Sequence, residues 1–393
     1  MDLERFTSDA PGKLVKIELL EGGQDWAFVP HPLPRDWRPS SEEMHDLLGE
    51  ARERLGTLNG IGHTLLNPDL LLRPLRQREA ILSSRLEGTH VEEVAYLGFR
   101  DAMRDDAAHT SDHFNSQREV ANYARALEQG TRLLDDLPLC GRLFRELHGI
   151  LLRGVRGREK RPGQFRDSQV HVGLGRRFNP PPYKDVDKLL AELESSLNEA
   201  GDTTNPLIRA FMAHYQFETI HPFADGNGRI GRVLLSLCTY HWHGHAHPLL
   251  YMSPYFEQNK DDYIDGLFRV STHGDWDSWI AFCLRGAIAQ CADSVQRCKA
   301  LTDLRQAFHE TSSSLGPRMR RIVDAMFEYS PVFSVSDVMS VCSVSRPTAQ
   351  KDIDALVEAG IVAHAMGEKP RIYVAPSVID VAYDKPFAAS SKS

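Results

Sequence analysis

The stretch PLIRAFMAHYQFETIHPFADGNGRIGRVLLSLCTY, residues 206–240, decides the fold and the chemistry of this chain. Apolar residues recur at spacings of three and four on both sides of a glycine-rich centre, which predicts two amphipathic helices. Asn205 is a good N-cap for the first helix and Pro206 suits its first position. Pro222 ends that helix at His221. The stretch therefore predicts a helix, a glycine-rich loop and a second helix.

The loop sequence GNGRIG, residues 226–231, satisfies the pattern G-x-G-x-x-G of dinucleotide-binding folds. That fingerprint requires a preceding strand and an acidic residue about 20 positions further on. Here the preceding segment is helical, and no acidic residue follows before Glu257. The chain also lacks the G-x-x-x-x-G-K-[ST] sequence of a P-loop. The loop therefore predicts neither an NAD site nor a P-loop.

Phosphate binding is still favoured by the residue types of this loop. Glycines let a phosphate approach the backbone closely, and the N-terminus of the following helix offers free N–H groups. Arg229 and Arg232 lie three positions apart, where two guanidinium groups can hold successive phosphates. Asp225 is well placed to hold Mg²⁺ that bridges those phosphates. His221 adds a general base with a suitable intrinsic pKa.

Residues 221–232, HPFADGNGRIGR, resemble the motif HPFx(D/E)GNGRxxR of Fic-domain proteins at every specified position. The resemblance implies an all-α Fic core that transfers AMP from ATP to a Tyr, Thr or Ser hydroxyl of a target protein. By the same resemblance, His221 deprotonates that hydroxyl and Phe223 anchors the loop in the core. The resemblance also implies that Asp225 coordinates Mg²⁺. It further implies that Gly226, Asn227 and Gly228 form an anion hole, and that Arg229 and Arg232 hold the outer phosphates.

Two further segments resemble parts of the same family. QVHVGLGRRFNPPP, residues 169–182, alternates Val170 and Val172 with polar neighbours and predicts a short hairpin. It resembles the family's flap, where Val170, His171 and Val172 would dock the target segment by strand addition. Downstream, LLYMSPYFEQNKDDYIDGL, residues 249–267, resembles the rest of the core, where Tyr255, Asn259 and Tyr263 are the expected nucleoside contacts.

REAILSSRLEG, residues 78–88, reads as a helix that ends at Gly88. Glu87 would lie in its last turn, where the helix dipole disfavours a negative charge by ~0.3–1 kcal/mol. Such a cost suggests a cationic partner. Ser83, Glu87 and Gly88 resemble the (S/T)xxxE(G/N) inhibitory motif found N-terminal to some Fic cores. The resemblance implies that Glu87 contacts Arg232 and takes the place of the γ-phosphate of ATP.

Composition narrows the class of protein. Of the 393 residues, 41% are hydrophobic. The net charge is −8, and a negative protein has no overall attraction to nucleic acid or to anionic membranes. No apolar run approaches the length of a spanning helix, and the six cysteines lack C-x-x-C spacing. We expect a cytoplasmic, all-α protein with reduced thiols and one small β-hairpin flap.

The expected organisation is a Fic N-terminal domain with the inhibitory helix over 1–115, a Fic catalytic core over 116–310, a linker over 311–317, and a winged helix over 317–376. The first 40 residues predict an extended strip, and residues 382–393 predict a disordered tail. The winged-helix segment carries seven basic and seven acidic residues, so a protein-contact or homodimer role is favoured over DNA binding.

Several alternatives remain open. The same site could transfer UMP, phosphate or another nucleotide-derived group, or remove AMP from a modified protein. A different class of protein would be a DNA-binding regulator whose pocket only senses a nucleotide, although a sensor has no need for His221 as a base. HWHGHAH, residues 241–247, is interpreted as surface histidines and not as a metal site.

Overall fold

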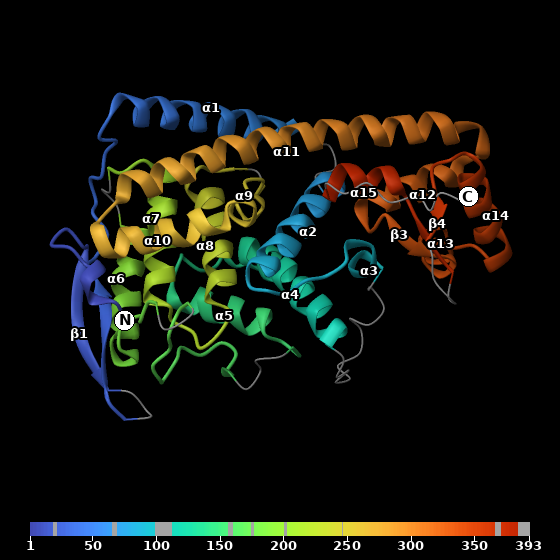
Figure 1. Ribbon diagram of the computed structural model, residues 1–393. Coiled ribbons are helices and arrows are strands. Elements are labelled where there is room, and N and C mark those ends of the chain that lie inside the picture. Colours follow the sequence, from blue (N-terminus) through green and yellow to red (C-terminus); the bar gives the residue numbers. More distant parts are fainter. Residues whose placement is uncertain are drawn as a thin grey trace, which may run out of the picture.

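The computed structural model describes residues 1–18, 22–64, 69–98, 112–155, 160–173, 177–199, 203–245, 247–365 and 371–383. The chain is mostly helical, as predicted, with a strand pair at one end of the helical body and a smaller C-terminal unit at the other (Figure 1). The helices of the body are α1 (Glu42–Thr64), α2 (Asp69–Leu86), α3 (Glu93–Leu97), α4 (Asp112–Leu133), α5 (Gly141–Leu151), α6 (Val186–Asn198), α7 (Pro206–Ile220), α8 (Asn227–Trp242), α9 (Ser253–Gln258), α10 (Lys260–His273) and α11 (Trp276–Ser312).

The predicted helix–loop–helix unit is formed by α7 and α8, which pack against each other at the centre of the core. The Asn205 side chain accepts a hydrogen bond from the Leu207 N–H, and Pro206 is the first helical residue. The helix ends at His221, which adopts a left-handed conformation with φ 51°. Gly226, with φ 78°, then precedes α8. The backbone reverses sharply within five residues, and the loop lies at the N-terminus of a buried helix.

Helix α2 connects the centre of the body to the rest of the molecule. It packs against α4, α9 and α12 and also contacts α8. The buried carboxyl of Glu79 accepts hydrogen bonds from the Tyr123 hydroxyl at 2.8 Å and from the Ser253 hydroxyl at 2.5 Å. These bonds join the middle of α2 to α4 and α9.

Residues 12–18 and 24–30 pair as a β-hairpin that the sequence did not predict. Strands β1 (Gly12–Glu18) and β2 (Gln24–Pro30) pair antiparallel, with Leu14 opposite Phe28. The segment is extended, as the sequence predicts, but its pairing into a hairpin was not predicted. The Phe28 side chain is fully buried and packs near Phe178 of the flap. The hairpin thus supports the flap.

The C-terminal unit contains α12 (Pro317–Glu328), β3 (Val332–Ser334), α13 (Val335–Cys342), α14 (Arg346–Glu358), β4 (Ala363–His364), β5 (Ile372–Val374) and α15 (Pro376–Tyr383). Its sheet is antiparallel with the order β3-β5-β4. The three helices and the two strands expected of a wing are present, and the assignment as a winged helix stays a prediction. Helix α15 was not predicted. It buries Ala382 and Tyr383, so residues 382 and 383 do not belong to a disordered tail, while 384–393 lie outside the described residues.

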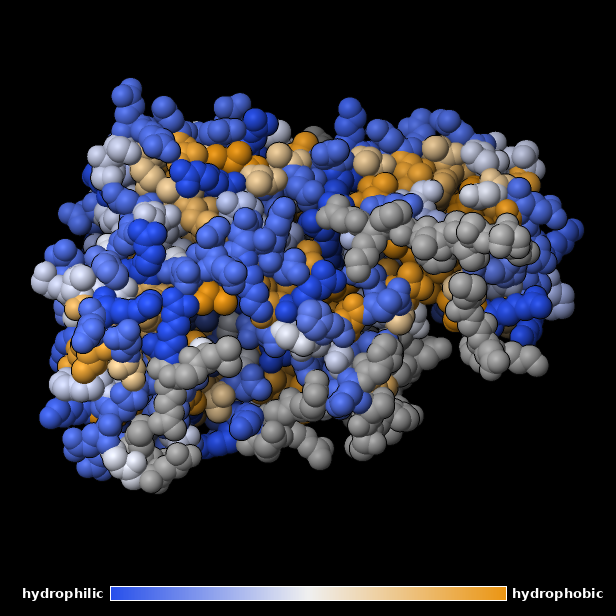
Figure 2. Space-filling model, viewed as in Figure 1, coloured by the Kyte–Doolittle hydropathy of each residue, from blue (hydrophilic) through white to orange (hydrophobic). Residues whose placement is uncertain are grey.

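The expected linker is also shorter than predicted. Helix α11 continues to Ser312, a 3-10 turn follows over Ser313–Leu315, and α12 begins at Pro317. In the view of Figure 2, hydrophilic residues cover much of the helical body, with apolar residues between them. Within the described ranges, every helix is too short or too polar to span a lipid bilayer.

Candidate active site

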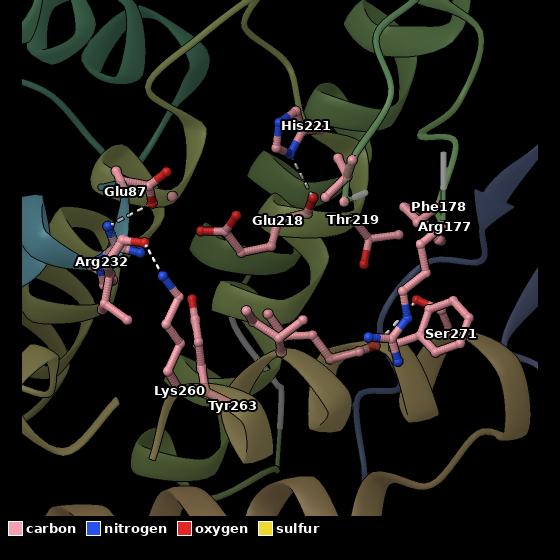
Figure 3. A pocket seen from close by; sticks show the side chains of 17 residues that line it. Glu87, Arg177, Phe178, Glu218, Thr219, His221, Arg232, Lys260, Tyr263 and Ser271 are labelled. Atoms are coloured by element: carbon pink, nitrogen blue, oxygen red, sulfur yellow. Dashed lines mark hydrogen bonds and ion pairs between the residues drawn. The ribbon is translucent and has the colours of Figure 1, made fainter. Parts of the chain in front are cut away.

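A cavity of about 280 Å³ opens where the end of α2, the flap, the α7–α8 loop and α10 meet (Figure 3). One part of its wall is polar, and the other is apolar. The lining residues are Leu86, Glu87, Val172, Gly173, Arg177, Phe178, Glu218, Thr219, His221, Gly228, Arg232, Lys260, Tyr263, Ile264, Leu267, Phe268 and Ser271. The arrangement suits a ligand with an anionic end and an apolar end.

His221 faces this cavity in a defined protonation state. Its Nδ1 lies 3.2 Å from the backbone oxygen of Glu218, and because a carbonyl only accepts, Nδ1 carries the proton. Nε2 therefore keeps its lone pair. Burial lowers the pKa of His221 to about 4, and the nearby positive charge of Arg166 acts in the same direction. The imidazole is thus neutral near pH 7 and ready to accept a proton.

The loop after His221 is held by buried side chains. Phe223 is fully buried, and its ring stacks on His148 with 3.8 Å between the ring centroids. Asn227 Oδ1 accepts from the Phe223 N–H at 2.8 Å, and Asn227 Nδ2 donates to the Phe223 oxygen at 2.8 Å. The Asn227 side chain therefore shapes the loop, whereas we had expected it to form part of the anion hole. His148 Nε2 lies 3.0 Å from the Asp225 oxygen and ties α5 to the same loop.

Arg232 contacts two residues of the predicted inhibitory motif, Ser83 and Glu87, and Glu87 lines the cavity. Arg232 is 2% exposed; its Nε donates to Ser83 Oγ at 2.7 Å, and its Nη2 donates to Glu87 Oε1 at 2.8 Å. Gly88, with φ +85°, provides the turn that follows. Burial raises the pKa of Glu87, but the charge and hydrogen bonding of Arg232 outweigh it, so that this pKa lies below its ordinary value. Glu87 is therefore ionised in the ion pair.

Gly228 explains why Glu87 can lie so close to the loop. A Cβ atom at this position would lie 2.1 Å from Glu87 Oε1 and 2.9 Å from Arg232 Nη1. Any side chain would therefore have to push the carboxylate away. The absence of a side chain leaves an anion-sized space above the loop, and the Glu87 carboxylate fills it in this structure.

Arg229 and Asp225 occupy the opposite side of the loop. Arg229 Nη1 lies 3.4 Å from Glu119 Oε2, and Arg229 Nη2 lies 3.5 Å from Asp225 Oδ1. The Asp225 side chain is 45% exposed, so its carboxylate is accessible to a hydrated cation. Among the described residues, no group of three His, Cys, Asp or Glu side chains has metal-site geometry. Asp225 alone fits a Mg²⁺ ion that takes its other ligands from phosphate and water.

The sequence assigned no role to Glu218 or Lys260, which are both polar residues of the cavity lining. Glu218 lies one helical turn before His221, a spacing that places both on one face of α7, and burial raises the pKa of its carboxyl to about 8. Glu218 Oε1 has no hydrogen-bond partner among the residues described. Lys260 Nζ donates to the Leu86 oxygen at 2.8 Å and so holds the end of α2 beside Glu87. No local pattern in the sequence points to Lys260.

The three expected nucleoside contacts are only partly brought together. Tyr263 lines the cavity, and its hydroxyl lies 2.9 Å from His214 Nε2. Tyr255 does not line it: its ring packs on Phe282 at 5.1 Å. Asn259 donates its Nδ2 hydrogen to the Tyr255 oxygen at 2.9 Å and is likewise outside the lining. The expectation for Tyr255 and Asn259 is therefore not met by this geometry.

The flap is shorter than the predicted hairpin. Among the described residues it contains one antiparallel bridge, Val172 to Phe178, and residues 174–176 at its turn lie outside them. Val172 lines the cavity, whereas Val170 and His171 are partly buried outside the lining. His171 Nδ1 lies 2.6 Å from Asn179 Oδ1, and Asn179 Nδ2 donates to the Trp26 oxygen at 2.7 Å. The N-terminal hairpin thus braces the flap from behind.

Comparisons with known proteins agree with this geometry. Residues 138–239 match the sequence model of the Fic/DOC family, and residues 45–132 match that of the Fic/DOC family N-terminal region. The chain is 42% identical over 76 residues to protein adenylyltransferase fic-1 of Caenorhabditis elegans, which is 19% of this chain and 14% of that protein. It is 35% identical over 132 residues to protein adenylyltransferase Fic of Aedes aegypti, 33% of this chain and 23% of that protein. The match thus spans less than a quarter of the length of these relatives.

Two solved structures share the fold. A Fic family protein from Desulfovibrio desulfuricans superposes with a TM-score of 0.55 and 21% identity, over 86% of this chain and 98% of that one. Fic-1 of C. elegans superposes with a TM-score of 0.51 and 20% identity, over 65% of this chain and 73% of that one. At these identities the likeness concerns the fold alone.

Proposed function

Because this chain belongs to the Fic/DOC family, we propose that it is a protein adenylyltransferase, which moves AMP from ATP to a hydroxyl side chain of a target protein. The observation that carries the proposal is the pairing of a neutral imidazole, His221, with a glycine-rich phosphate site at one cavity. A base without a phosphate site would have no electrophile nearby, and a phosphate site without a base would only bind its ligand.

In the proposed reaction the target hydroxyl oxygen attacks the α-phosphorus of ATP. An O–P bond forms to the target, the bond between the α-phosphorus and the bridging oxygen breaks, and pyrophosphate leaves. His221 Nε2 takes the hydroxyl proton, because Nδ1 is already protonated and bound to the Glu218 oxygen. The N-terminal N–H groups of α8 and the guanidinium groups of Arg229 and Arg232 offset the phosphate charge.

Mg²⁺ bound at Asp225 would neutralise phosphate charge and orient the triphosphate. The protein side of that site is one accessible carboxylate, held in place because Asp225 Oδ1 accepts from the Gly226 N–H at 2.6 Å. The apolar wall formed by Ile264, Leu267 and Phe268 would receive the nucleoside, with Tyr263 at its edge.

We further propose that the enzyme is autoinhibited by Glu87. The carboxylate occupies the space above Gly228 and takes the Arg232 hydrogen bond that an outer phosphate would need. The flap, through the backbone of Val172, would align the target segment in front of His221. The six cysteines are buried and unpaired, which suits a protein of the reducing cytoplasm.

A second candidate reaction at this site is transfer of another nucleotide-derived group, because the described phosphate contacts do not select the base. One experiment separates these reactions. The Glu87→Gly variant is incubated with target lysate and either α-labelled or γ-labelled ATP, with Mg²⁺. We expect His221-dependent label on protein from α-labelled ATP alone, a mass increase of one AMP, and loss of that label with His221→Ala in the same background. Label from γ-labelled ATP that is likewise lost with His221→Ala would instead indicate phosphate transfer and would contradict the proposal.

A further inference from the structure

Arg166 is a buried arginine that joins the flap to the loop carrying His221. Its side chain is largely enclosed, with 5% of the residue exposed. Its Nε donates to the His221 oxygen at 2.9 Å, and its Nη2 lies 3.4 Å from the Ile220 oxygen. On the other side, Nη1 donates to the Ser168 oxygen at 3.2 Å and Nη2 to the Pro181 oxygen at 2.5 Å.

These four acceptors lie on two separate pieces of structure. Ile220 and His221 form the C-terminal end of α7, whereas Ser168 and Pro181 flank the flap at its two ends. The Arg166 backbone N–H also donates to the Pro222 oxygen at 2.9 Å. One side chain therefore fixes both ends of the flap relative to the left-handed residue that places the imidazole.

The buried guanidinium of Arg166 is unusual because it has no carboxylate partner among the described residues. In the described parts of the chain, no carboxylate forms an ion pair with Arg166, and its donors go to backbone oxygens. A buried charge without a counter-ion is costly unless its hydrogen bonds are satisfied. Here the acceptors include the carbonyl end of a helix, where the helix dipole favours a cation. The planar fork of a guanidinium suits several acceptors at once, whereas a lysine ammonium has a different geometry.

We propose that Arg166 is a positioning residue for transfer: it sets the distance between the flap, where the target segment docks, and His221. The proposal rests on the proposed function, because the flap is taken as the docking site.

A second consequence concerns the charge of Arg166. Arg166 lies close enough to His221 to lower the pKa of the imidazole, while Glu87 and Asp225 act to raise it. Replacement of Arg166 should therefore change both the rate and its dependence on pH.

Two variants separate geometry from charge. Arg166→Lys keeps the positive charge but cannot reach all four backbone oxygens. Arg166→Met removes both the charge and the hydrogen bonds to these oxygens. Each is made in the Glu87→Gly background, with Arg161→Met as a matched control. Arg161 lies five residues earlier, and its guanidinium pairs with the exposed Asp167. Transfer is measured with α-labelled ATP as kcat and KM over a range of pH, and backbone hydrogen exchange is followed by mass spectrometry.

For Arg166→Lys we expect kcat to fall by about ten-fold or more, because small misplacements of reacting groups are costly, while KM for ATP stays within about two-fold. The acid limb of its pH–rate profile, where His221 becomes protonated, should not move. Arg166→Met should show the same loss of kcat. The acid limb of its pH–rate profile should move to higher pH, because the charge that lowers the pKa of His221 is removed. In both variants the peptides covering 168–182 and 220–223 should exchange faster than in the Arg161→Met control.

Two results would overturn the proposal: an Arg166→Lys variant with the parental kcat, or unchanged exchange in both peptides. A rise in KM for ATP that parallels the loss of kcat would likewise reduce Arg166 to a structural residue. If the Glu87→Gly parent transfers no AMP at all, the proposed function fails, and the exchange data alone then decide whether Arg166 holds the flap to the loop.

Discussion

Arg232 and Glu87 form an ion pair at 2.8 Å although they lie 145 positions apart in the sequence. The pair joins the end of α2 to the second turn of α8, directly above Gly228. A hydrogen bond between charged groups contributes about 1.5–3 kcal/mol. An incoming phosphate must displace Glu87 before it can use Arg232 fully, so the ion pair and the phosphate compete for the same donor.

Removal of this charge should activate the protein. We expect Glu87→Gln to raise the rate of AMP transfer about 10- to 100-fold, because every 1.4 kcal/mol corresponds to about a factor of ten. The measurement is the initial rate with α-labelled ATP. Glu257→Gln is the matched control: Glu257 of α9 lies 3.7 Å from Arg85 of α2 and is outside the cavity lining. Equal rates for Glu87→Gln and wild type would refute the inhibitory role.

Ser83→Ala should destabilise the protein and activate it less than Glu87→Gln. The change leaves the buried Arg232 Nε–H without the Ser83 Oγ acceptor, which costs about 1–3 kcal/mol. The free energy of unfolding, measured in urea, tests this. Ser84→Ala is a close control, because Ser84 Oγ is buried without a hydrogen-bond partner among the described residues. Similar losses for the two variants would show that the Ser83 hydroxyl contributes nothing specific.

The sequence predicted the helix–loop–helix unit because its signals are local. Asn205, Pro206 and Pro222 fix the ends of α7, and helical periodicity continues through α8. It predicted the contact of Glu87 with Arg232 only through the family resemblance, since nothing local connects positions that far apart. The contributions of Arg166 and Lys260 could not be predicted, because each depends on backbone oxygens that only the tertiary structure brings together.

The misplaced expectations have a similar cause. Tyr255 and Asn259 lie close to Tyr263 in sequence, but the turn of helix at α9 directs Tyr255 toward Phe282 and away from the cavity. The β1–β2 hairpin was not predicted because β2 ends in Pro30 and has consecutive buried residues, Ala27 to Pro30, in place of a clear alternation.

In the Glu87→Gly variant the acid limb of the pH–rate profile should lie near pH 4 or below, because burial lowers the pKa of His221 to about 4 from an ordinary value of 6.5 and the Glu87 charge that acts to raise it is removed. The base works only when neutral, so activity should persist at pH 6, where an exposed histidine would be largely protonated. The measurement is kcat/KM of the Glu87→Gly variant between pH 4.5 and 7. A midpoint near 6.5 would contradict the buried environment of the imidazole.

Glu218 should give an alkaline limb. Burial raises the pKa of its carboxyl to about 8, so it is neutral near pH 7 and becomes charged above pH 8. The new negative charge would lie in the cavity that receives the triphosphate, and ATP binding should weaken as pH rises. Glu218→Gln keeps the shape and cannot ionise. We expect Glu218→Gln to retain AMP transfer at pH 9, where the protein with Glu218 loses it. An identical decline in both proteins would exclude Glu218 as the cause.

Val172→Pro should impair docking of the target more than binding of ATP. The Val172 N–H donates to the Phe178 oxygen at 2.8 Å, and proline has no N–H to replace it. Loss of this bond should open the only bridge seen among the described residues of the flap, so that the edge offered to the target is no longer extended. We expect KM for a target protein to rise about ten-fold while KM for ATP changes by less than about two-fold. Val172→Ala, which keeps the N–H, should show a smaller effect. A parallel loss of both constants in Val172→Pro would mean that the flap supports the nucleotide site and does not act as a separate docking edge.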